Sequence, residues 1–330
     1  MKQPPVAGKG GALMTDQKGE MKKQRWMKLE LSVPEALVDG VSNFMIEIGA
    51  QGVYEETLGP WEANELPEAV GNQAVFAFLP FDLHLENRIA KLQGYLEDLA
   101  DLFPDLGRVS YSQEAIEDPD WGEQWKKYFK PLRVSREIVI KPSWERYTPQ
   151  GGDIVIEIDP GMAFGTGQHA STRMCLEALE DIISKDRAVQ GWQVLDVGTG
   201  TGILGIACAK LGAEKILCLD IDRKAVSIAR ENVQVNEVAD RVKVSSRDVT
   251  NLDGAFDLIV ANLTEKLLIK LRPTLISLLR PRGYLVISGI IADNRLMIED
   301  NFLAGPLSLH HTLTEEEWIC YVLKKKEENT

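Results

Sequence analysis

The glycine-rich stretch at residues 194–205 constrains the fold of this chain more than any other feature of its sequence. An apolar run ends in the carboxylate of Asp196, and glycines follow at every second position, at Gly198, Gly200 and Gly202, before a helix-like segment. Glycine lets the backbone turn sharply and approach a ligand closely. Because open α/β sheets bind ligands at the carboxyl ends of their strands, the stretch predicts a ligand-binding turn between a strand and a helix.

Two cofactor classes compete for this turn. Gly200, Gly202 and Gly205 satisfy the G-x-G-x-x-G pattern, and Asp220 lies 20 residues after Gly200, which is an acceptable dinucleotide fingerprint. Asp196 argues against that interpretation, because a carboxylate ahead of the glycines would oppose a pyrophosphate. It suits the positive amino and sulfonium groups of S-adenosylmethionine, and Asp-x-Gly-x-Gly-x-Gly is the usual signature of class I methyltransferases. We therefore favour S-adenosylmethionine, with an NAD-dependent oxidoreductase as the alternative.

The second half of the chain alternates strands and helices from residue 153 onward, which predicts a mostly parallel sheet with helices on both faces. The expected strands are 154–158, 193–197, 215–220, 242–245, 256–261 and 284–288, and the expected helices are 171–184, 203–211, 223–236, 265–279 and 293–302. Two closing strands at 307–313 and 318–323 are typical of the class I methyltransferase sheet. We predict a Rossmann-like α/β domain with a seven-stranded mixed sheet.

The first half has the order β-α-β-β-α-β, which predicts a ferredoxin-like α+β domain. Its expected strands are 26–33, 50–56, 74–79 and 108–113, and its expected helices are 34–48 and 83–102. The predicted division of the chain is a flexible tail at 1–24, a ferredoxin-like substrate-recognition domain at 25–117, a connector at 118–150 and a catalytic domain at 151–330.

Acidic charge is concentrated in the first of these domains. The chain carries a net charge of -13, and residues 25–117 hold 5 Lys and Arg against 17 Asp and Glu, a net of -12. Such a surface repels nucleic acid and accelerates the encounter with a basic protein. A role in solubility alone is the competing explanation. We expect a protein partner and no direct contact with nucleic acid.

The sequence predicts a cytoplasmic protein. Residues 1–24 contain no apolar segment of the kind found in secretory signals, and no run of about 18 apolar residues suggests a membrane span. Cys175, Cys208, Cys218 and Cys320 are not spaced as metal ligands or as a redox pair. We expect them to be buried free thiols, and we expect no metal site.

Further acids follow the predicted strands. Asp220 ends the predicted strand 215–220, where a carboxylate can accept hydrogen bonds from both hydroxyl groups of a ribose, and Ile221 follows it in the candidate site. Asp222 is placed to cap the helix that begins at Arg223. Asp248 follows the predicted strand 242–245, where it either meets an adenine amino group or is a plain loop acid.

Asn262 comes directly after the predicted strand 256–261. Together with Leu263, it is a candidate for contact with the cofactor. Its amide offers both a donor and an acceptor, so it could hold the amino-acid part of the cofactor or orient an incoming amine. The alternative is a cap for the helix that starts near Glu265, but Thr264 can fill that position instead.

A second glycine loop, at residues 159–172, lies directly before a predicted helix. The candidate cofactor contacts in it are Phe164, Gly165, Thr166, Gly167 and Thr172. The helix N-terminus can receive a carboxylate, and we expect Ser171 or Thr172 to cap it. His169 is a candidate catalytic residue, with an orienting role favoured over that of a general base.

Several motifs together resemble the PrmA family, which methylates large-subunit ribosomal protein eleven. They are D-P-G-M-A-F-G-T-G-Q-H, D-V-G-T-G-T-G, L-D-I-D, V-A-N-L, L-V-I-S-G-I-I and the connector D-P-D-W-G-E-Q-W-K-K-Y-F-K-P. The resemblance covers about residues 25–330. It implies that cofactor contacts fall on Thr172, Gly198, Asp220 and Asn262. It also implies that methyl groups go to amino groups of that ribosomal protein, on lysine side chains or at the N-terminus, and that the acidic domain docks this partner.

The chain departs from the family in a few places. His169-Ala170-Ser171-Thr172 stands where the family commonly has H-P-T-T, Thr199 and Thr201 stand within its usual G-C-G-S-G, and residues 262–264 replace its usual N-I-L. These changes spare the glycines and the acids. Another protein or a small amine remains an alternative methyl acceptor. A cofactor-binding adaptor without catalytic activity is a further alternative. The sequence leaves the oligomeric state open, and we take a monomer as the default.

Overall fold

The computed structural model describes residues 25–34, 37–50, 52–55, 72–104, 107–116, 126, 129–159, 167, 169–185 and 191–327. The predicted tail at 1–24 and the start of the predicted connector lie outside these residues. So do three of the candidate cofactor contacts, Phe164, Gly165 and Thr166.

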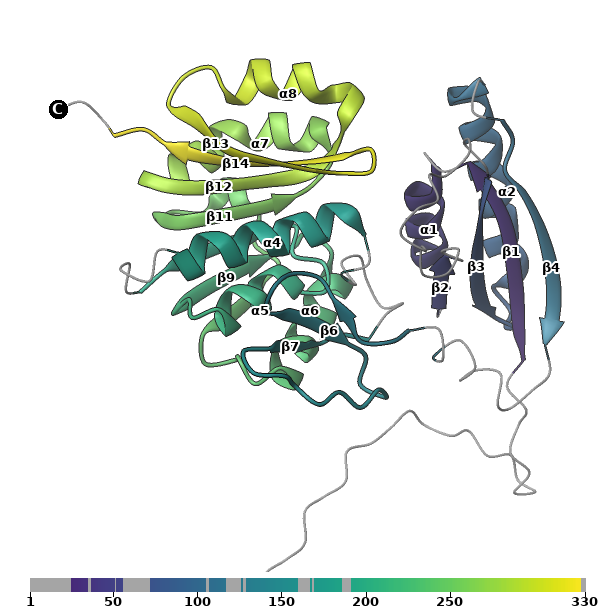
Figure 1. Cartoon of the computed structure of the whole chain (residues 1–330). Coiled ribbons are helices and arrows are strands. Elements are labelled where there is room, and N and C mark those ends of the chain that lie inside the picture. The colour runs from purple at the N-terminus through teal and green to yellow at the C-terminus, as the bar shows by residue number, and fades with distance from the viewer. Residues whose placement is uncertain are drawn as a thin grey trace, which may run out of the picture.

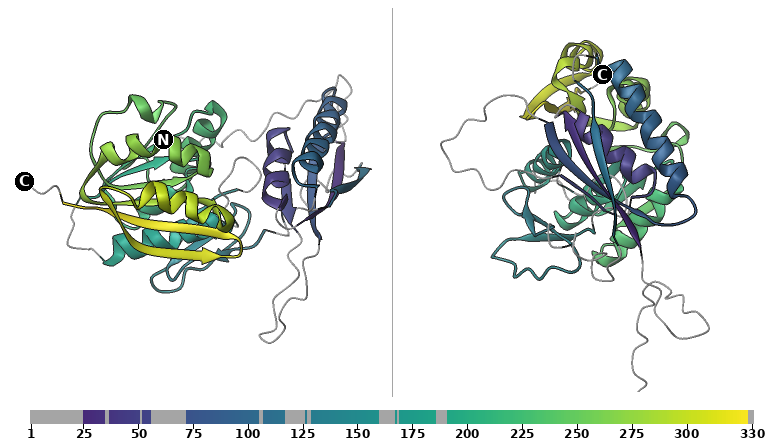
Figure 2. Two further views of the ribbon diagram at one scale, coloured as in Figure 1. Left: turned by 90° about the horizontal axis from the view of Figure 1, so that it is seen from above. Right: turned by 90° about the vertical axis from the view of Figure 1, so that its right-hand side faces the viewer.

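A four-stranded antiparallel sheet with two helices forms the first part of the chain. Its elements are β1 (Trp26–Pro34), α1 (Val38–Glu47), β2 (Gly52–Glu55), β3 (Asn72–Pro80), α2 (Leu85–Leu102) and β4 (Ser110–Ile116). The strand order is β2-β3-β1-β4, and both helices lie on one face of the sheet (Figures 1 and 2). This is the ferredoxin-like arrangement that the sequence predicted.

The core of this part follows from alternation along β1. Leu29, Leu31 and Val33 are fully buried because every second side chain of a strand points to the same face. They pack in one apolar cluster with residues of the helices, including Val41 of α1 and Leu92 of α2.

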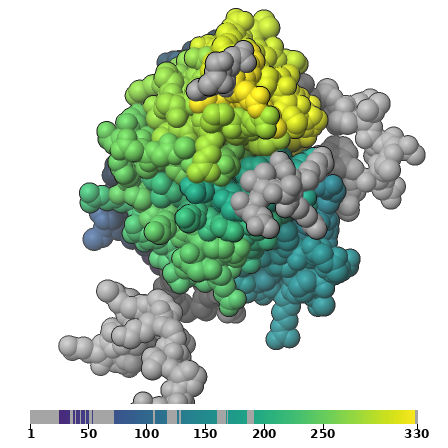
Figure 3. All heavy atoms as spheres, turned by 90° about the vertical axis from the view of Figure 1, so that its left-hand side faces the viewer, coloured from purple at the N-terminus to yellow at the C-terminus, as the bar shows by residue number. Residues whose placement is uncertain are grey.

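A small separate sheet follows, and it corrects one prediction. It consists of β5 (Leu132–Arg133), β6 (Ile138–Lys141) and β7 (Ile154–Glu157), in the order β5-β6-β7. We expected strand 154–158 to open the alternation of the main sheet, but β7 pairs in parallel with β6 instead. The amide of Asn236 holds the backbone N–H and C=O of Glu157, which fastens β7 beside α6 (Arg223–Val235). Figure 3 shows this teal segment against the green surface of the following domain.

The main sheet has seven strands in the order β10-β9-β8-β11-β12-β14-β13. They are β8 (Gln193–Val197), β9 (Lys215–Leu219), β10 (Val242–Ser245), β11 (Phe256–Asn262), β12 (Leu279–Ile291), β13 (Leu307–Glu315) and β14 (Trp318–Lys325). β14 runs antiparallel to both of its neighbours, and the pairs from β10 to β12 are parallel. The predicted seven-stranded mixed sheet is confirmed.

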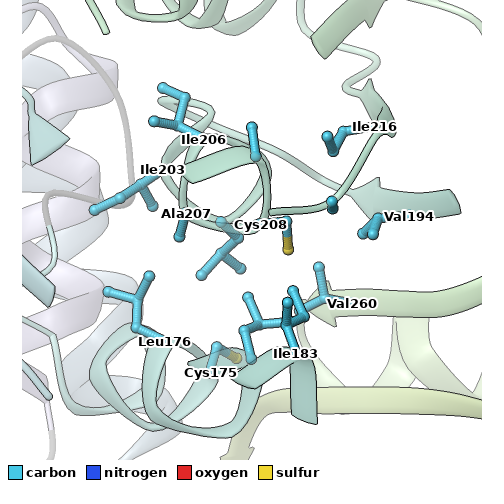
Figure 4. Close-up of a cluster of buried hydrophobic side chains, with 14 of the residues drawn as sticks. Cys175, Leu176, Ile183, Val194, Ile203, Ile206, Ala207, Cys208, Ile216 and Val260 are labelled. Carbon is cyan, nitrogen blue, oxygen red and sulfur yellow. The ribbon is translucent and has the colours of Figure 1, made fainter. Parts of the chain in front are cut away.

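Two apolar clusters cover the two faces of this sheet. Val194 and Val260 belong to the cluster formed with α4 (Ala170–Lys185) and α5 (Ile203–Lys210), part of which Figure 4 shows. Leu195 and Ile259, the sequence neighbours of Val194 and Val260 on the same strands, belong to the cluster formed with α7 (Glu265–Leu278) and α8 (Arg295–Phe302). Alternate residues of one strand therefore serve opposite layers.

The four cysteines are free and buried, as expected. Within the described ranges, no helix is long and apolar enough to cross a membrane.

Candidate active site

The carboxyl ends of three neighbouring strands bring the candidate residues together. Val197 of β8 lies beside Leu219 of β9 on one side and Ala261 of β11 on the other. Asp220 and Asn262 therefore flank the glycine loop that follows β8. The first turn of α4 joins them through hydrogen bonds from Asn262.

The glycine loop has backbone conformations that favour glycine. The φ angles are 74° at Gly198, 54° at Gly200 and 85° at Gly202, and side-chain-bearing residues rarely adopt such values. The Gly198 N–H donates to the Leu219 carbonyl oxygen at 2.8 Å. A Cβ at Gly198 would lie 2.4 Å from Cδ2 of Leu263, so this backbone can lie close to its neighbours only without a side chain.

Asp196 lies beneath the loop and is completely buried. Its Oδ2 accepts hydrogen bonds from Thr199 Oγ1 at 2.5 Å and from the Gly205 N–H at 3.1 Å. Burial raises the pKa of this carboxyl to about 6, although the two donors act in the opposite direction. Among the described residues, Oδ1 has no hydrogen-bond partner. Asp196 thus holds the shape of the loop, and its contact with the cofactor stays a prediction.

Asp220 is held at the tip of β9 by two backbone groups. Its Oδ2 accepts from the Gly200 N–H at 3.0 Å and its Oδ1 from the Asp222 N–H at 2.9 Å. Each carboxylate oxygen keeps a further lone pair, so the group can still accept from two hydroxyls. Ile221 beside it is 81% exposed, an apolar side chain at the rim of the site. Asp222 accepts from the Lys224 N–H at 2.8 Å, which confirms its predicted role as the cap of α6.

Asp248 has a local structural role. Its Oδ1 accepts from both the N–H and the hydroxyl of Thr250 at 2.8 Å, which caps the short turn Val249–Asn251. These bonds lower the pKa of its carboxyl. Contact with an adenine amino group stays a prediction.

Asn262 turns toward α4 and does not cap α7. Its Nδ2 donates to Ser171 Oγ at 3.0 Å and to Thr172 Oγ1 at 3.3 Å, and both of these hydroxyl residues are buried. The N-cap position of α7 belongs to Thr264, although its side chain makes no capping hydrogen bond. The Leu263 N–H donates to the Ser288 carbonyl, which anchors the segment after β11.

His169 occupies the position before α4 and corrects another prediction. We expected Ser171 or Thr172 to cap this helix, but both are inside its first turn. The His169 Nδ1 accepts the Ser171 N–H at 3.0 Å, and its carbonyl accepts from the N–H groups of Thr172 and Arg173. The imidazole contacts the ring of Trp318 on β14 edge to face, with 4.7 Å between the two ring centroids. This geometry favours the orienting role over that of a base.

Two other residues complete the picture of the site. Gly167 has a φ of 82°, and a Cβ there would meet Ile140 Cδ1 at 2.0 Å, so the Gly167 backbone packs tightly on β6. Trp318 was missed by sequence reasoning, because nothing in its spacing relates a residue near the C-terminus to His169.

The comparisons with known proteins decide the family. The family model described as ribosomal protein L11 methyltransferase (PrmA) matches residues 25–326. The chain belongs to the ribosomal protein L11 methyltransferase family. Its relatives include the ribosomal protein L11 methyltransferase of Geotalea daltonii, 39% identical over 305 residues that cover 90% of this chain and 97% of that protein. The enzyme of Thermoanaerobacter pseudethanolicus is 35% identical, with 92% and 100% covered.

A solved structure agrees with this L11 methyltransferase assignment. The ribosomal protein L11 methylase of Lactobacillus delbrueckii subsp. bulgaricus is 33% identical, matches 60% of this chain and all of that chain, and has a TM-score of 0.54. Membership confirms the predicted S-adenosylmethionine-dependent transfer of methyl groups to L11, and the NAD-dependent oxidoreductase was the wrong alternative.

The site fits S-adenosylmethionine as the cofactor of this L11 methyltransferase. The loop at Gly198 and Gly200 presents backbone without side chains, and Asp220 offers a fixed pair of acceptors beside the exposed side chain of Ile221. Sugar hydroxyls need acceptors of this kind, and an adenine ring needs an apolar neighbour.

Proposed function

We propose that this chain binds S-adenosylmethionine at the tips of β8, β9 and β11 and transfers its methyl group to lysine side chains and the N-terminal amine of L11. The observation that carries the proposal is the convergence of the Gly200 loop, Asp220 and Asn262 at one edge of the sheet. S-adenosylmethionine supplies a methyl group on a positively charged sulfur. The chain itself binds the cofactor, orients the acceptor amine beside it and removes water from both.

The cofactor-binding residues divide by the part of the ligand that each suits. Asp220 accepts hydrogen bonds from the ribose hydroxyls, while Ile221 and Asp248, which follow β9 and β10, border the adenine. The remaining proposed contacts come from the two glycine loops, from α4 and from the ends of β8 and β11: Phe164, Gly165, Thr166, Gly167, Thr172, Asp196, Gly198, Gly200, Gly202, Asn262 and Leu263. The dipole of the 16-residue helix α4 favours the carboxylate at its N-terminus, although the N–H groups of Ser171, Thr172 and Arg173 already donate to His169.

Positioning is the main catalytic contribution. Methyl transfer from a sulfonium is an in-line displacement, in which the gain comes from holding the nucleophile near the methyl carbon. A lysine amine has a pKa of about 10.4 in water and must lose a proton first. Desolvation beside a cation favours the neutral amine. Asn262 and nearby backbone carbonyls orient that amine, and water removes the proton, so no dedicated base is required.

The acidic domain at residues 25–117 is the proposed docking module for L11. On α2, the side chains of Glu86, Glu97, Asp98 and Asp101 are exposed. A field of one sign attracts a basic partner and speeds the encounter. In this proposal the connector at 118–150 lets the module move relative to the catalytic domain at 151–330. The enzyme acts as a cytoplasmic monomer and makes no direct contact with nucleic acid.

Transfer of a labelled methyl group to purified L11 tests the proposal. Asn262→Ala should lower kcat by more than about tenfold, because it removes the group that orients the amine. Full turnover by this variant would remove Asn262 from the mechanism. Labelling of a whole lysate addresses the remaining alternative: a dominant labelled species other than L11 would identify another protein or a small amine as the acceptor.

A further inference from the structure

A chain of side-chain contacts links β14, the strand beside the edge strand β13 of the main sheet, to Asn262. Trp318 of β14 contacts the imidazole of His169, whose Nδ1 lies 2.6 Å from Ser171 Oγ. Ser171 Oγ in turn lies 3.0 Å from Asn262 Nδ2. Ser171 is completely buried, so water does not compete for these bonds.

The backbone sets the position of every proton in this chain. The Ser171 N–H donates to His169 Nδ1 at 3.0 Å, so Nδ1 carries no proton of its own. The close contact between Ser171 Oγ and the same Nδ1 must then be a bond that the hydroxyl donates. A serine hydroxyl has one proton, and this bond uses it. Toward Asn262, Ser171 can therefore only accept.

The amide of Asn262 consequently has one favourable orientation. Its NH₂ group faces the hydroxyls of Ser171 and Thr172, and its Oδ1 faces the opposite side, toward β12. There Gly289 has a φ of 81°, and a Cβ at this residue would lie 2.9 Å from Asn262 Oδ1 and 2.6 Å from the Leu263 carbonyl oxygen. The absence of a side chain at Gly289 leaves two carbonyl-type oxygens beside each other at the strand tips.

We propose that Ser171 and His169 are positioning residues, which hold Asn262 so that its oxygen, and not its NH₂ group, accepts an N–H of the incoming amine. This inference rests on the proposed function, in which Asn262 orients the amine. A neutral primary amine has two N–H donors and needs acceptors, so an amide turned the other way would present donors to donors. Neither residue touches the substrate, and both act through Asn262.

A double-mutant cycle separates positioning from a general structural role. Ser171→Ala should lower kcat about tenfold and leave the dissociation constant of S-adenosylmethionine within about twofold, because the two bonds it loses, to His169 and to Asn262, position Asn262 and not the cofactor. Ser171→Thr keeps the hydroxyl and should retain most of the wild-type kcat. In the Asn262→Ala background, Ser171→Ala should have no further effect. An equal loss of kcat in both backgrounds, or full kcat in Ser171→Ala, overturns the inference.

Nitrogen NMR of the His169 ring gives a readout that does not depend on catalysis. In the intact chain, the neutral ring should show Nδ1 without a proton and Nε2 with one, and Ser171→Ala should shift the side-chain amide resonances of Asn262. A proton on Nδ1 of the neutral ring overturns the inference even if Asn262 proves essential. If Asn262→Ala keeps full turnover while the ring shows the expected pattern, Asn262 does not orient the amine and that part of the proposed function is wrong. Ser171 and His169 would then hold Asn262 without contributing to catalysis.

Discussion

The two halves of the candidate active site are built in different ways. The cofactor half, at the tips of β8 and β9, consists of glycine backbone and two carboxylates and lies within 25 residues of sequence, from Asp196 to Asp220. The acceptor half joins Asn262 to Ser171 and Thr172, which are 91 and 90 positions away, through side chains alone. A local motif therefore suffices for the first half, whereas the second exists only once the sheet has formed.

This contrast predicts separable defects. Changes at Gly198 or Asp220 in the cofactor half should weaken binding of S-adenosylmethionine, whereas Ser171→Ala on the acceptor side should spare binding and reduce transfer.

The largest effect is expected from removing residues 1–117. Without the acidic docking module, transfer to L11 should be abolished, while calorimetry should show cofactor binding close to that of the full chain, because no residue of the strand tips is lost. Methylation of L11 at the wild-type rate by the truncated chain would contradict the docking role.

Gly198→Ala should weaken cofactor binding about 100-fold, since the new Cβ would clash with Leu263 and strain a backbone that glycine favours. Gly212→Ala is the matched control: its φ of 112° is also positive, but a Cβ there meets nothing within 4 Å. Equal affinity loss in both variants would mean that backbone strain, and not the shape of the loop, determines binding.

Asp220→Ala should weaken cofactor binding about tenfold and leave kcat at saturating cofactor nearly unchanged, because the carboxylate holds the ribose and not the reacting atoms. Asp222→Ala, two residues away, loses only the cap of α6 and should lower the free energy of unfolding by about 1 kcal/mol. A fall in kcat without a change in affinity for Asp220→Ala would contradict the division into two halves.

A smaller effect concerns pH. The folded chain holds a proton on Asp196 up to a pKa of about 6, whereas the unfolded chain releases it near 3.8. Between these values the folded state binds more protons, so the contribution of Asp196 to stability is complete below pH 3.8 and is lost as the pH rises to 6. Denaturant titrations without cofactor should show that Asp196→Asn removes part of this decline. An identical decline in the variant would assign it to other groups.

The positions of the residues in the cofactor half were predictable because their sequence signals are local, and their contact with the cofactor stays a prediction. Glycine spacing and an acid at each strand end gave Asp196, Gly198, Gly200 and Asp220 their places, and the capping role of Asp222 followed from the same pattern. The alternation of short apolar segments with helix-like segments predicted the main strands.

Contacts between distant segments escaped prediction. β7 fits the alternation of strands and helices and was therefore assigned to the main sheet. Its pairing with β6 and its hydrogen bond to Asn236 place it in the small three-stranded sheet instead. The cap of α4 was assigned to Ser171 or Thr172 because of their hydroxyl groups. In the structure the imidazole of His169, in contact with Trp318, accepts the N–H of Ser171. No periodicity encodes a contact across 149 positions.

Calorimetric titration of the intact chain with S-adenosylmethionine tests the central claim most directly. The account predicts saturable uptake of one cofactor per chain, weakened by Asp220→Ala. No uptake by the intact chain would contradict the assignment of the strand tips as the methyl-donor site.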